Sequence, residues 1–280
     1  MTRLAPIACC LLAACAATPP AATVNDVTPL VDGELAFAAH TAAHGWNAGV
    51  RSFAAPDAVV ADPLPINAYA SLAPADDVDA ASPLQWRPAF AGMADSGDLG
   101  FTTGPWFLEN HGYGGHYFTV WRRAASGEWQ WIFDGGVKVL DDAPQAAGAA
   151  VARLSSSARG RGAARALAAV RELESTVARL AATDAGAALA ARLGAEVHLN
   201  RAAQPRAVGT DAARAVLARS AVAVRYEPAG AVASRAGDLV FTYGRASWND
   251  GAGHAGSYAR IWQLQPGGWR IVYDQIVPPR

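Results

Sequence analysis

The chain has 280 residues, a formal net charge of −1 and a hydrophobic content of 52%. This length allows one large domain or two ordinary ones, and the apolar content supports a packed core and excludes a disordered chain. Nucleic-acid recognition requires a basic surface, and a near-neutral chain without a basic stripe does not supply one. We therefore expect a folded protein with no nucleic-acid partner.

The first fifteen residues, "MTRLAPIACCLLAAC", have the pattern of an export signal, because Arg3 is followed by a short apolar run that ends at Cys15. The run is too short for a permanent membrane-spanning helix. Residues 12–15 resemble the bacterial lipobox, so we predict lipidation of Cys15; cleavage as an ordinary signal peptide near Ala17 is the alternative. Residues 16–27, rich in alanine, threonine and proline, are predicted to form a tether.

A lipid on Cys15 would hold the protein at a membrane surface without a spanning helix. In Gram-negative lipoproteins an aspartate after the cysteine usually means retention in the inner membrane, so Ala16 favours the outer membrane, facing the periplasm. All the cysteines, Cys9, Cys10 and Cys15, precede the tether. We therefore expect an exported body with no disulfide, no thiol nucleophile and no cysteine-based zinc site.

The first half reads as helices followed by strands. Glu34, Phe37 and Thr41 recur at helical spacing, Gly45 breaks this helix, and a second short helix follows. Five prolines in residues 54–83 indicate loops or short strands. The last two predicted strands carry apolar side chains on both faces, which indicates a sheet covered on both sides. The predicted antiparallel meander covers residues 84–88, 98–106, 117–123 and 129–136.

The second half repeats this plan. The stretch "SGDLGFTTG" at 96–104 returns as "AGDLVFTYG" at 236–244, 140 residues later, after a long helix at 163–182 and a second short helix at 184–194. This pattern predicts a tandem duplication of one α+β unit. The polar, glycine-broken linker favours a solvated tether over a basic patch on anionic lipid. The predicted organisation is a first domain at 28–142, a linker at 143–162 and a second domain at 163–280.

Helices followed by a sheet that ends in "GxYxxxWR" and "GxWxxxxD" resemble the nuclear-transport-factor-2-like, ketosteroid-isomerase-like superfamily, and most closely its SnoaL-like exported members of unknown function. The second half departs more, because Gln275 replaces Gly135 and Trp248 is shifted relative to Trp106. The residues that carry the resemblance are Glu34, Phe37, Trp86, Pro88, Gly97–Gly104, Tyr117, Trp121, Trp129 and Asp134.

The resemblance implies an α+β fold of two tandem cone-shaped domains, each with N-terminal helices packed on a curved antiparallel sheet and a pocket at its open end. The outer sheet face of such cones often pairs with a second copy, so we expect the two halves to form an intramolecular pseudo-dimer. That superfamily includes isomerases, cyclases, dehydratases, ligand carriers and dimerisation modules. The fold alone therefore assigns no activity.

Two residues are candidate general acid–base catalysts. Asp134 ends the last strand of the first half, where isomerase-like members use a carboxyl inside an apolar pocket; a structural role is the alternative. Strand alternation puts Asp134 on the face of Ile132, opposite Trp131 and Phe133. His116 lies near the expected pocket mouth, as a proton shuttle or as a solvated loop residue.

Other polar residues give weaker signals. The first helix carries Phe37 and His40 and lacks the tyrosine of ketosteroid isomerases, which counts against that activity. His40 and His44 share a helix face, but two ligands alone are a weak metal signal, so we expect no metal and no cofactor. Asp98 and Asp238 open matching strands and are interpreted as turn residues that cap backbone amides, with a catalytic base as the alternative.

The leading hypothesis is that one or both halves bind a small apolar or amphipathic ligand, or act as an interaction module in the cell envelope. The rival is a cofactor-free isomerase or lyase that uses Asp134 or His116. A buried carboxyl near a histidine or tyrosine in an open pocket would favour the enzyme, and a pocket filled with aromatic rings would favour the module. The predicted ligand-binding residues are Trp86, Trp106, His116, Tyr117, Trp121, Asp134, Tyr243, Tyr258 and Asp274.

Overall fold

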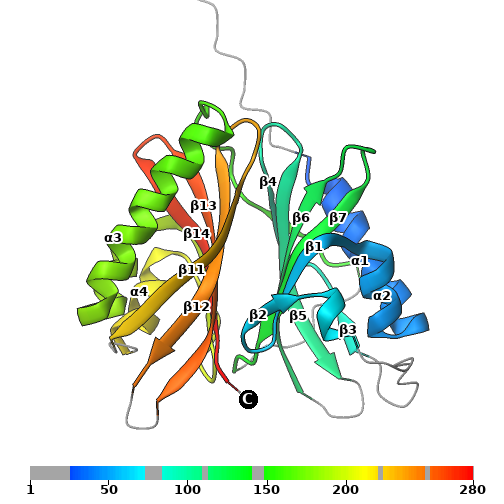
Figure 1. Ribbon diagram of the computed structural model, residues 1–280, viewed down its shortest axis with the longest axis horizontal. Helices are drawn as coiled ribbons and strands as arrows, with labels where there is room; N and C mark the ends of the chain where they lie inside the picture. The colour runs from blue at the N-terminus through cyan, green and yellow to red at the C-terminus, as the bar shows by residue number, and fades with distance from the viewer. Residues whose placement is uncertain are drawn as a thin grey trace, which may run out of the picture.

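The computed structural model describes residues 26–72, 84–108, 113–140, 148–219, 223–249 and 253–279. These residues form two α+β domains, each with its helices against one face of a curved sheet (Figure 1). Residues 1–25, including the predicted lipidation site Cys15, lie outside the described part. No helix in the described part is long and apolar enough to cross a membrane.

The first domain begins with two helices, α1 (Thr28–His44) and α2 (Trp46–Phe53), which meet at Gly45. Gly45 has a φ of 84°, which glycine adopts without steric cost, so the chain can turn there. The strands lie in the order β2-β1-β7-β6-β5-β4-β8, with β3 beside β5. Their bounds are β1 (Ala54–Ala61), β2 (Pro65–Asn67), β3 (Leu84–Trp86), β4 (Phe90–Met93), β5 (Leu99–Leu108), β6 (Tyr113–Arg123), β7 (Trp129–Val137) and β8 (Ala152–Arg153).

The second domain has a corresponding sheet, in the order β10-β9-β14-β13-β12-β11. Its long helix α3 (Ala163–Ala190) passes through a non-helical residue at Asp184. This kink divides α3 into two helices, so the second short helix predicted at 184–194 is confirmed, although it ends at Ala190 and β9 begins at Leu193. The remaining elements are α4 (Thr210–Arg219), β9 (Leu193–Arg201), β10 (Ala207–Val208), β11 (Val224–Ala233), β12 (Leu239–Trp248), β13 (His254–Gln265) and β14 (Gly268–Val277).

Each sheet is mostly antiparallel, as predicted, but it also contains at least one parallel strand pair. Strand β1 runs parallel to β7, with Val60 opposite Asp134, and β9 runs parallel to β14, with Leu199 opposite Asp274. The sequence signal for β1 was weak because prolines interrupt the segment that contains it. Both parallel strands follow a helix within two residues, so the chain returns across the sheet directly from the helix that covers it.

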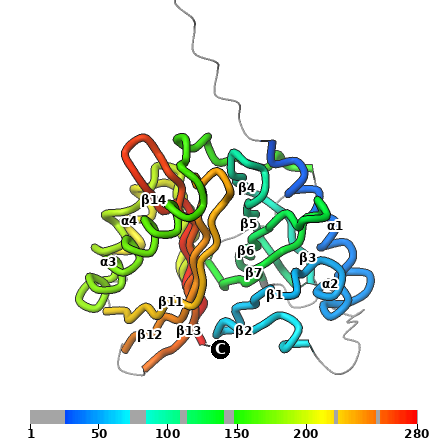
Figure 2. The backbone as a smooth tube through the Cα atoms, turned by 45° about the horizontal axis from the view of Figure 1, so that its top comes forward, coloured from blue at the N-terminus to red at the C-terminus, as the bar shows by residue number. Residues whose placement is uncertain are grey.

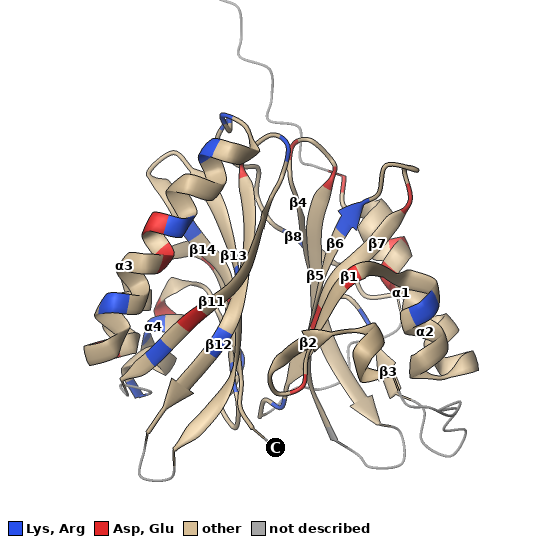
Figure 3. Cartoon of the chain, viewed as in Figure 1, with Lys and Arg blue, Asp and Glu red and all other residues tan. Residues whose placement is uncertain are grey.

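The two sheets pack face to face, with the helices outside (Figures 1 and 2). The rings of Phe118 and Tyr273 are stacked with their centroids 4.0 Å apart, and the centroids of Phe133 and Phe241 are 5.1 Å apart. This packing covers the second face of each sheet, which explains why the last strands are apolar on both sides. Charged residues of both signs are interspersed along α3, on the outside (Figure 3).

The repeated "GDL" turns meet at the junction of the two domains. The Asp98 carboxylate accepts a hydrogen bond from the backbone N–H of Arg235 at 3.1 Å, and the Asp238 carboxylate accepts one from the backbone N–H of Asp95 at 2.8 Å. Each turn therefore caps an amide of the other domain. Neither aspartate lines a cavity described below, so both have a structural role here.

The described part of the predicted linker is held against both domains. Strand β8 pairs with β4, the Ser157 hydroxyl donates to Asp238 at 2.7 Å, and the backbone N–H of Ala158 donates to the carbonyl of Leu264 at 2.7 Å. The interpretation as a solvated tether was therefore wrong for residues 148–162. Short polar stretches of this kind lack the hydrophobic periodicity that would signal packing.

Candidate functional site

Glu34 is the buried polar centre of the first domain. It lies on α1, is 0% exposed, and accepts hydrogen bonds from the indole Nε1 atoms of Trp86 and Trp121 at 2.6 and 2.9 Å. The Thr102 hydroxyl donates a third bond, at 2.5 Å. Burial raises the pKa of Glu34, and these hydrogen bonds partly oppose the rise. The bonds tie α1 to three strands of the sheet.

Trp86 also lines an open cavity of about 490 Å³. Asp134 of β7 and Tyr117 of β6 contribute to the same wall. The Tyr117 hydroxyl is buried; it interacts with Thr102 but makes no hydrogen bond of ordinary geometry to the described residues. The lining residues are Trp46, Val60, Ala61, Asp62, Ser71, Leu84, Trp86, Trp106, Leu108, Tyr117, Asp134, Gly135 and Gly136.

Asp134 has the electrostatics of a proton-transfer group. Burial, reinforced by the charge of Glu34, raises the pKa of Asp134 to about 7, while the hydrogen bond from Thr119 opposes the rise. That bond joins the Thr119 hydroxyl to Asp134 Oδ2 at 2.9 Å. A carboxyl that exchanges its proton near neutral pH can serve as a general acid or base.

A β-bulge determines which side chains share the face of Asp134. Ile132 is an extra residue in β7, because its two neighbours pair with consecutive residues of β6. Simple alternation placed Trp131 opposite Asp134, and this was wrong: Trp131 packs 5.8 Å from Phe37 of α1, on the helix-covered face. Phe133 packs against the second domain, as predicted for the face opposite Asp134.

The second domain also has a buried acid on its long helix, but the partners of this acid differ from those of Glu34. Glu174 of α3 is the counterpart of Glu34, 140 residues later. It accepts hydrogen bonds from the Thr242 hydroxyl at 2.6 Å and the Trp262 indole at 2.8 Å. A third partner is the guanidinium of Arg260, whose Nη1 atom lies 2.7 Å from Glu174 Oε2.

Arg260 occupies the position that Thr119 has in the first domain. It pairs across the hairpin with Asp274, as Thr119 pairs with Asp134. Its Nε atom lies 2.5 Å from Asp274 Oδ2, and Arg201 of β9 contacts Oδ1 of the same carboxylate. Two guanidinium groups thus compensate two buried carboxylates in the second domain, whereas the first domain has a neutral hydroxyl between its acids.

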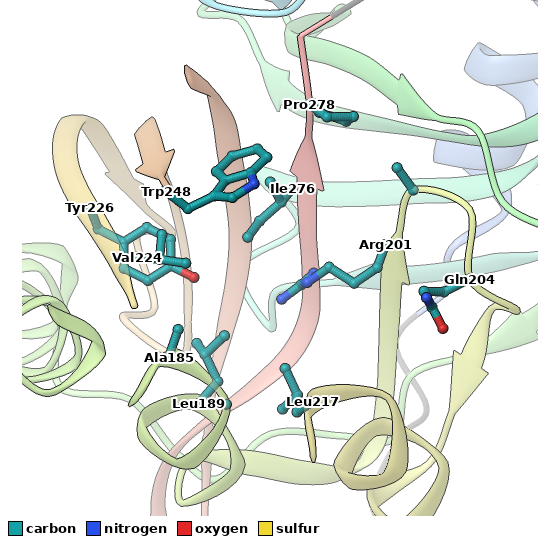
Figure 4. Close-up of a pocket in the computed structure, with 12 residues that line it drawn as sticks. Ala185, Leu189, Arg201, Gln204, Leu217, Val224, Tyr226, Trp248, Ile276 and Pro278 are labelled. Carbon is teal, nitrogen blue, oxygen red and sulfur yellow. The ribbon is translucent and has the colours of Figure 1, made fainter. Parts of the chain in front are cut away.

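The second domain has its own cavity, of about 280 Å³ (Figure 4). Arg201 and Tyr226 reach toward it from opposite walls. The guanidinium carbon of Arg260 lies 4.2 Å from the centroid of the Tyr226 ring and 4.3 Å from that of Tyr258. The two cavities therefore differ in their ionic group, a carboxyl in the first domain and a guanidinium in the second.

The structure brings only some of the predicted ligand-binding residues together. Trp121 is fully buried and serves to hold Glu34. Tyr258 and Asp274 are fully buried around Arg260 and do not belong to the cavity lining. The predicted residues that line the first cavity are Trp86, Trp106, Tyr117 and Asp134.

His116 and Tyr243 lie away from both cavities. His116 is 2% exposed within β6, and its neighbour Tyr117 takes the cavity side of that strand, which corrects its predicted place at a pocket mouth. Tyr243 lies between the two sheets, with its ring centroid 5.6 Å from that of Phe133. The described residues contain no group of three or more potential metal ligands.

Sequence reasoning missed the acids of the helices and the arginines of the second domain. Glu34 falls on the apolar stripe of its helix beside Phe37, and Glu174 recurs at the repeat offset; a charge on such a stripe is a readable signal of a buried acid. Arg260 stands inside an apolar strand and carries the same signal. Arg201 has no clear equivalent in the first half of the sequence, an asymmetry that hints that the two pockets differ, but its partner comes from another strand and could not be named.

No protein-family model matches the sequence, and no curated protein matches it. Solved structures give matches. One match is an NTF2-like protein of unknown function from Pseudomonas putida KT2440, 15% identical over 41% of this chain and 87% of that chain, with a TM-score of 0.36.

Two further matches have similar extents. A ketosteroid isomerase-like protein from Erwinia carotovora atroseptica SCRI1043 is 17% identical over 39% of this chain and 92% of that one, with a TM-score of 0.35. An NTF2-like protein with a cystatin-like fold from Novosphingobium aromaticivorans is 18% identical over 40% of this chain and 80% of that one, with a TM-score of 0.33. Function is argued below from the cavities.

Proposed function

We propose that the first domain binds a small, mostly apolar ligand in its 490 Å³ cavity, with a polar group of the ligand against Asp134 and Tyr117. The observation that carries this is the buried Tyr117 hydroxyl in the wall of an open cavity, which interacts with Thr102 but makes no hydrogen bond of ordinary geometry to the described residues. Buried polar groups are nearly always hydrogen-bonded, and a ligand would supply the missing bond.

The cavity wall supports a flat ligand with few polar atoms. Trp46, Trp86 and Trp106 present large apolar surfaces, and aromatic walls of this kind suit a ring system. Asp134, with a pKa of about 7, can donate a hydrogen bond when protonated and accept one when ionised. A ligand carbonyl could accept from the protonated carboxyl, and a ligand hydroxyl could bond to either protonation state.

A second candidate function is cofactor-free proton transfer, of the isomerase or lyase type. The shifted pKa of Asp134 favours it, because a general base is most effective when its pKa lies near the working pH. Tyr117 would then stabilise the oxygen on which negative charge develops, since burial keeps its hydroxyl protonated by raising its pKa. His116 is not part of this proposal.

The proposal also covers location. We infer that the protein is exported and anchored through a lipid on Cys15 to the outer membrane, facing the periplasm, on the support of the lipobox-like residues 12–15. An anchored domain with an open cavity would act on molecules that enter or cross the envelope. The lipid contact and the small ligand are the two partners of this proposal.

Native mass spectrometry of the protein extracted gently from its own membrane tests the binding proposal. We expect a stoichiometric small-molecule adduct that Ala61→Leu removes, because the larger side chain fills the first cavity. The matched control is Ala185→Leu, which fills the second cavity and should leave that adduct in place. The denatured mass reports the lipid on Cys15. An unchanged adduct in Ala61→Leu would contradict the proposal.

Proton transfer is tested separately by deuterium uptake. Ketones with an acidic α-hydrogen would be incubated with the protein in deuterated buffer and followed by proton NMR. We expect accelerated exchange that Asp134→Asn reduces by about 100-fold or more. Binding without any accelerated exchange would reject the enzymatic candidate and leave the binding proposal intact.

A further inference from the structure

The second cavity carries polar chemistry that the first lacks, and it is independent of the function proposed above. We propose that the second domain's cavity is a separate binding site for a small, uncharged, mostly apolar molecule that carries a carbonyl group. Its hydrogen-bond donors are the Tyr226 hydroxyl and the Arg201 guanidinium, which approach from opposite walls (Figure 4).

Tyr226 presents a fixed hydrogen-bond donor. Its side chain is 5% exposed, and its hydroxyl has no partner among the described residues. The ring is held by Tyr258, with centroids 5.0 Å apart, and by the guanidinium of Arg260. Burial raises the pKa of Tyr226, so the hydroxyl keeps its proton. A donor that is buried, oriented and unpartnered requires an acceptor from a ligand.

Arg201 supplies donors from the other side. Its Nη1 atom donates to the carbonyl of Asn200 at 2.9 Å and, at 3.5 Å, to that of Asp274, while Nη2 contacts the Asp274 carboxylate. A guanidinium has five N–H groups, so these three bonds leave two of them, one on Nη2 and one on Nε, for a ligand in the cavity that Arg201 lines. Arg201 is thus held in position by protein groups and still able to bind a ligand oxygen.

The charge balance selects an uncharged ligand. Arg201 and Arg260 are already compensated by Glu174 and Asp274 through the ion pairs described above. A ligand carboxylate would add one buried charge without a cation of its own, and a ligand amine would meet donors on both walls. A carbonyl oxygen accepts from both walls and brings no net charge.

The size of the cavity sets the size of the ligand. An apolar cavity of about 150 Å³ holds one benzene molecule. The second cavity, at about 280 Å³, therefore has room for one ring with a short substituent. Leu189, Leu217 and Ile276 line it and give the ring an apolar surface.

The test uses full-length protein with isotope-labelled leucine, isoleucine and valine methyl groups, titrated with acetophenone and followed by NMR. We expect saturable shifts at Leu189, Leu217 and Ile276, which report the second cavity; Val60 and Leu84 report the first. Ethylbenzene, which lacks the acceptor, and benzoate, which is charged, should each bind the second cavity about 3- to 10-fold more weakly. Equal or tighter binding of either probe would overturn the carbonyl assignment.

Matched tyrosine variants locate the hydrogen bond. Tyr226→Phe removes a hydroxyl with no partner in the described part of the chain, so folding should be retained, and acetophenone should bind about 3- to 10-fold more weakly at the second cavity. Tyr117→Phe makes the same change in the first cavity and should leave the second-cavity shifts unaltered. Unchanged affinity in Tyr226→Phe, or no saturable shift of the second-cavity methyl groups, would overturn the proposal.

Discussion

The two domains place the same acids at corresponding positions and compensate them differently. Glu34 and Asp134 in the first domain have Thr119 beside them, whereas their counterparts in the second domain share the guanidinium of Arg260. Arg260, together with Arg201 of β9, therefore holds the strand acid of the second domain in ion pairs, whereas the strand acid of the first domain is left with a raised pKa. Corresponding positions thus give a carboxyl with a raised pKa at the first cavity and an ion-paired guanidinium at the second.

The largest expected effect is that of Arg260→Thr, which gives the second domain the residue of the first. Two buried carboxylates lose their shared cation, so we expect unfolding free energy to fall by about 3 to 5 kcal/mol, measured by chemical denaturation. The control is Arg225→Thr, whose side chain is 77% exposed, with an expected change within about 0.5 kcal/mol. A loss below about 1 kcal/mol in Arg260→Thr would mean that the ion pairs contribute little.

A matched pair of amide variants sharpens the contrast. Asp274→Asn removes the negative charge that Arg201 and Arg260 contact, and we expect it to cost about 2 to 4 kcal/mol at pH 7.5. Asp134→Asn removes a carboxylate that has no cation beside it, so it should be neutral or stabilising at the same pH. Similar losses in the two variants would contradict the electrostatic difference between the domains.

The pH dependence of stability measures the contribution of the raised pKa of Asp134. Its folded-state pKa of about 7 lies above the ordinary value of 3.8, so the folded state binds the proton more tightly and its stability falls as pH rises between these values. The gain of Asp134→Asn over the wild type should therefore increase by about 3 kcal/mol between pH 5 and pH 8. Urea unfolding of both proteins at pH 5 and pH 8 measures this gain in stability.

The contributions of other titrating groups cancel when the stability of Asp134→Asn is compared with that of the wild type. His198, whose pKa burial lowers to about 3, contributes the opposite slope, because the unfolded state binds its proton first as pH falls. This contribution is the same in both proteins. A constant stability difference from pH 5 to pH 8 would show that Asp134 has an ordinary pKa.

The smallest expected effect concerns the two turns that meet between the domains. Asp238 is 0% exposed and accepts from the backbone N–H of Asp95 and from Ser157 and Ser234, so Asp238→Ala should cost about 1 to 3 kcal/mol. Asp98 is partly exposed, and Asp98→Ala should cost about 1 kcal/mol or less. Thermal unfolding of both variants measures the two losses of stability. Equal losses would contradict the larger role of Asp238.

Much of this architecture could be predicted from the sequence, because the strand patterns recur at a fixed offset and two apolar faces require two covering layers. Strands β1 and β9 could not be predicted. Prolines interrupt the segment that contains β1, and β9 directly continues the apolar pattern of a helix. The Ile132 bulge was also unpredictable, because an inserted residue leaves the apolar pattern of β7 intact while it reverses the face of Trp131.

The candidate site was predicted in part. Trp86, Trp106, Tyr117 and Asp134 were expected at a pocket, and their strand positions bring them to one cavity. His116 was misplaced, because neighbouring residues of a strand point to opposite faces and Tyr117 takes the cavity side. The role of Arg260 requires knowing that it lies between an acid on a helix and an acid on the next strand, which only the fold reveals.

Direct titration of the Asp134 carboxyl tests the central claim, that the first cavity holds a group poised for proton exchange. Carbon-13 NMR of aspartate-labelled protein, assigned with Asp134→Asn, would follow this carboxyl from pH 4 to pH 9. We expect a midpoint near 7. A midpoint near 3.8, the ordinary value, would contradict it and would leave the first cavity as a binding site without acid–base chemistry.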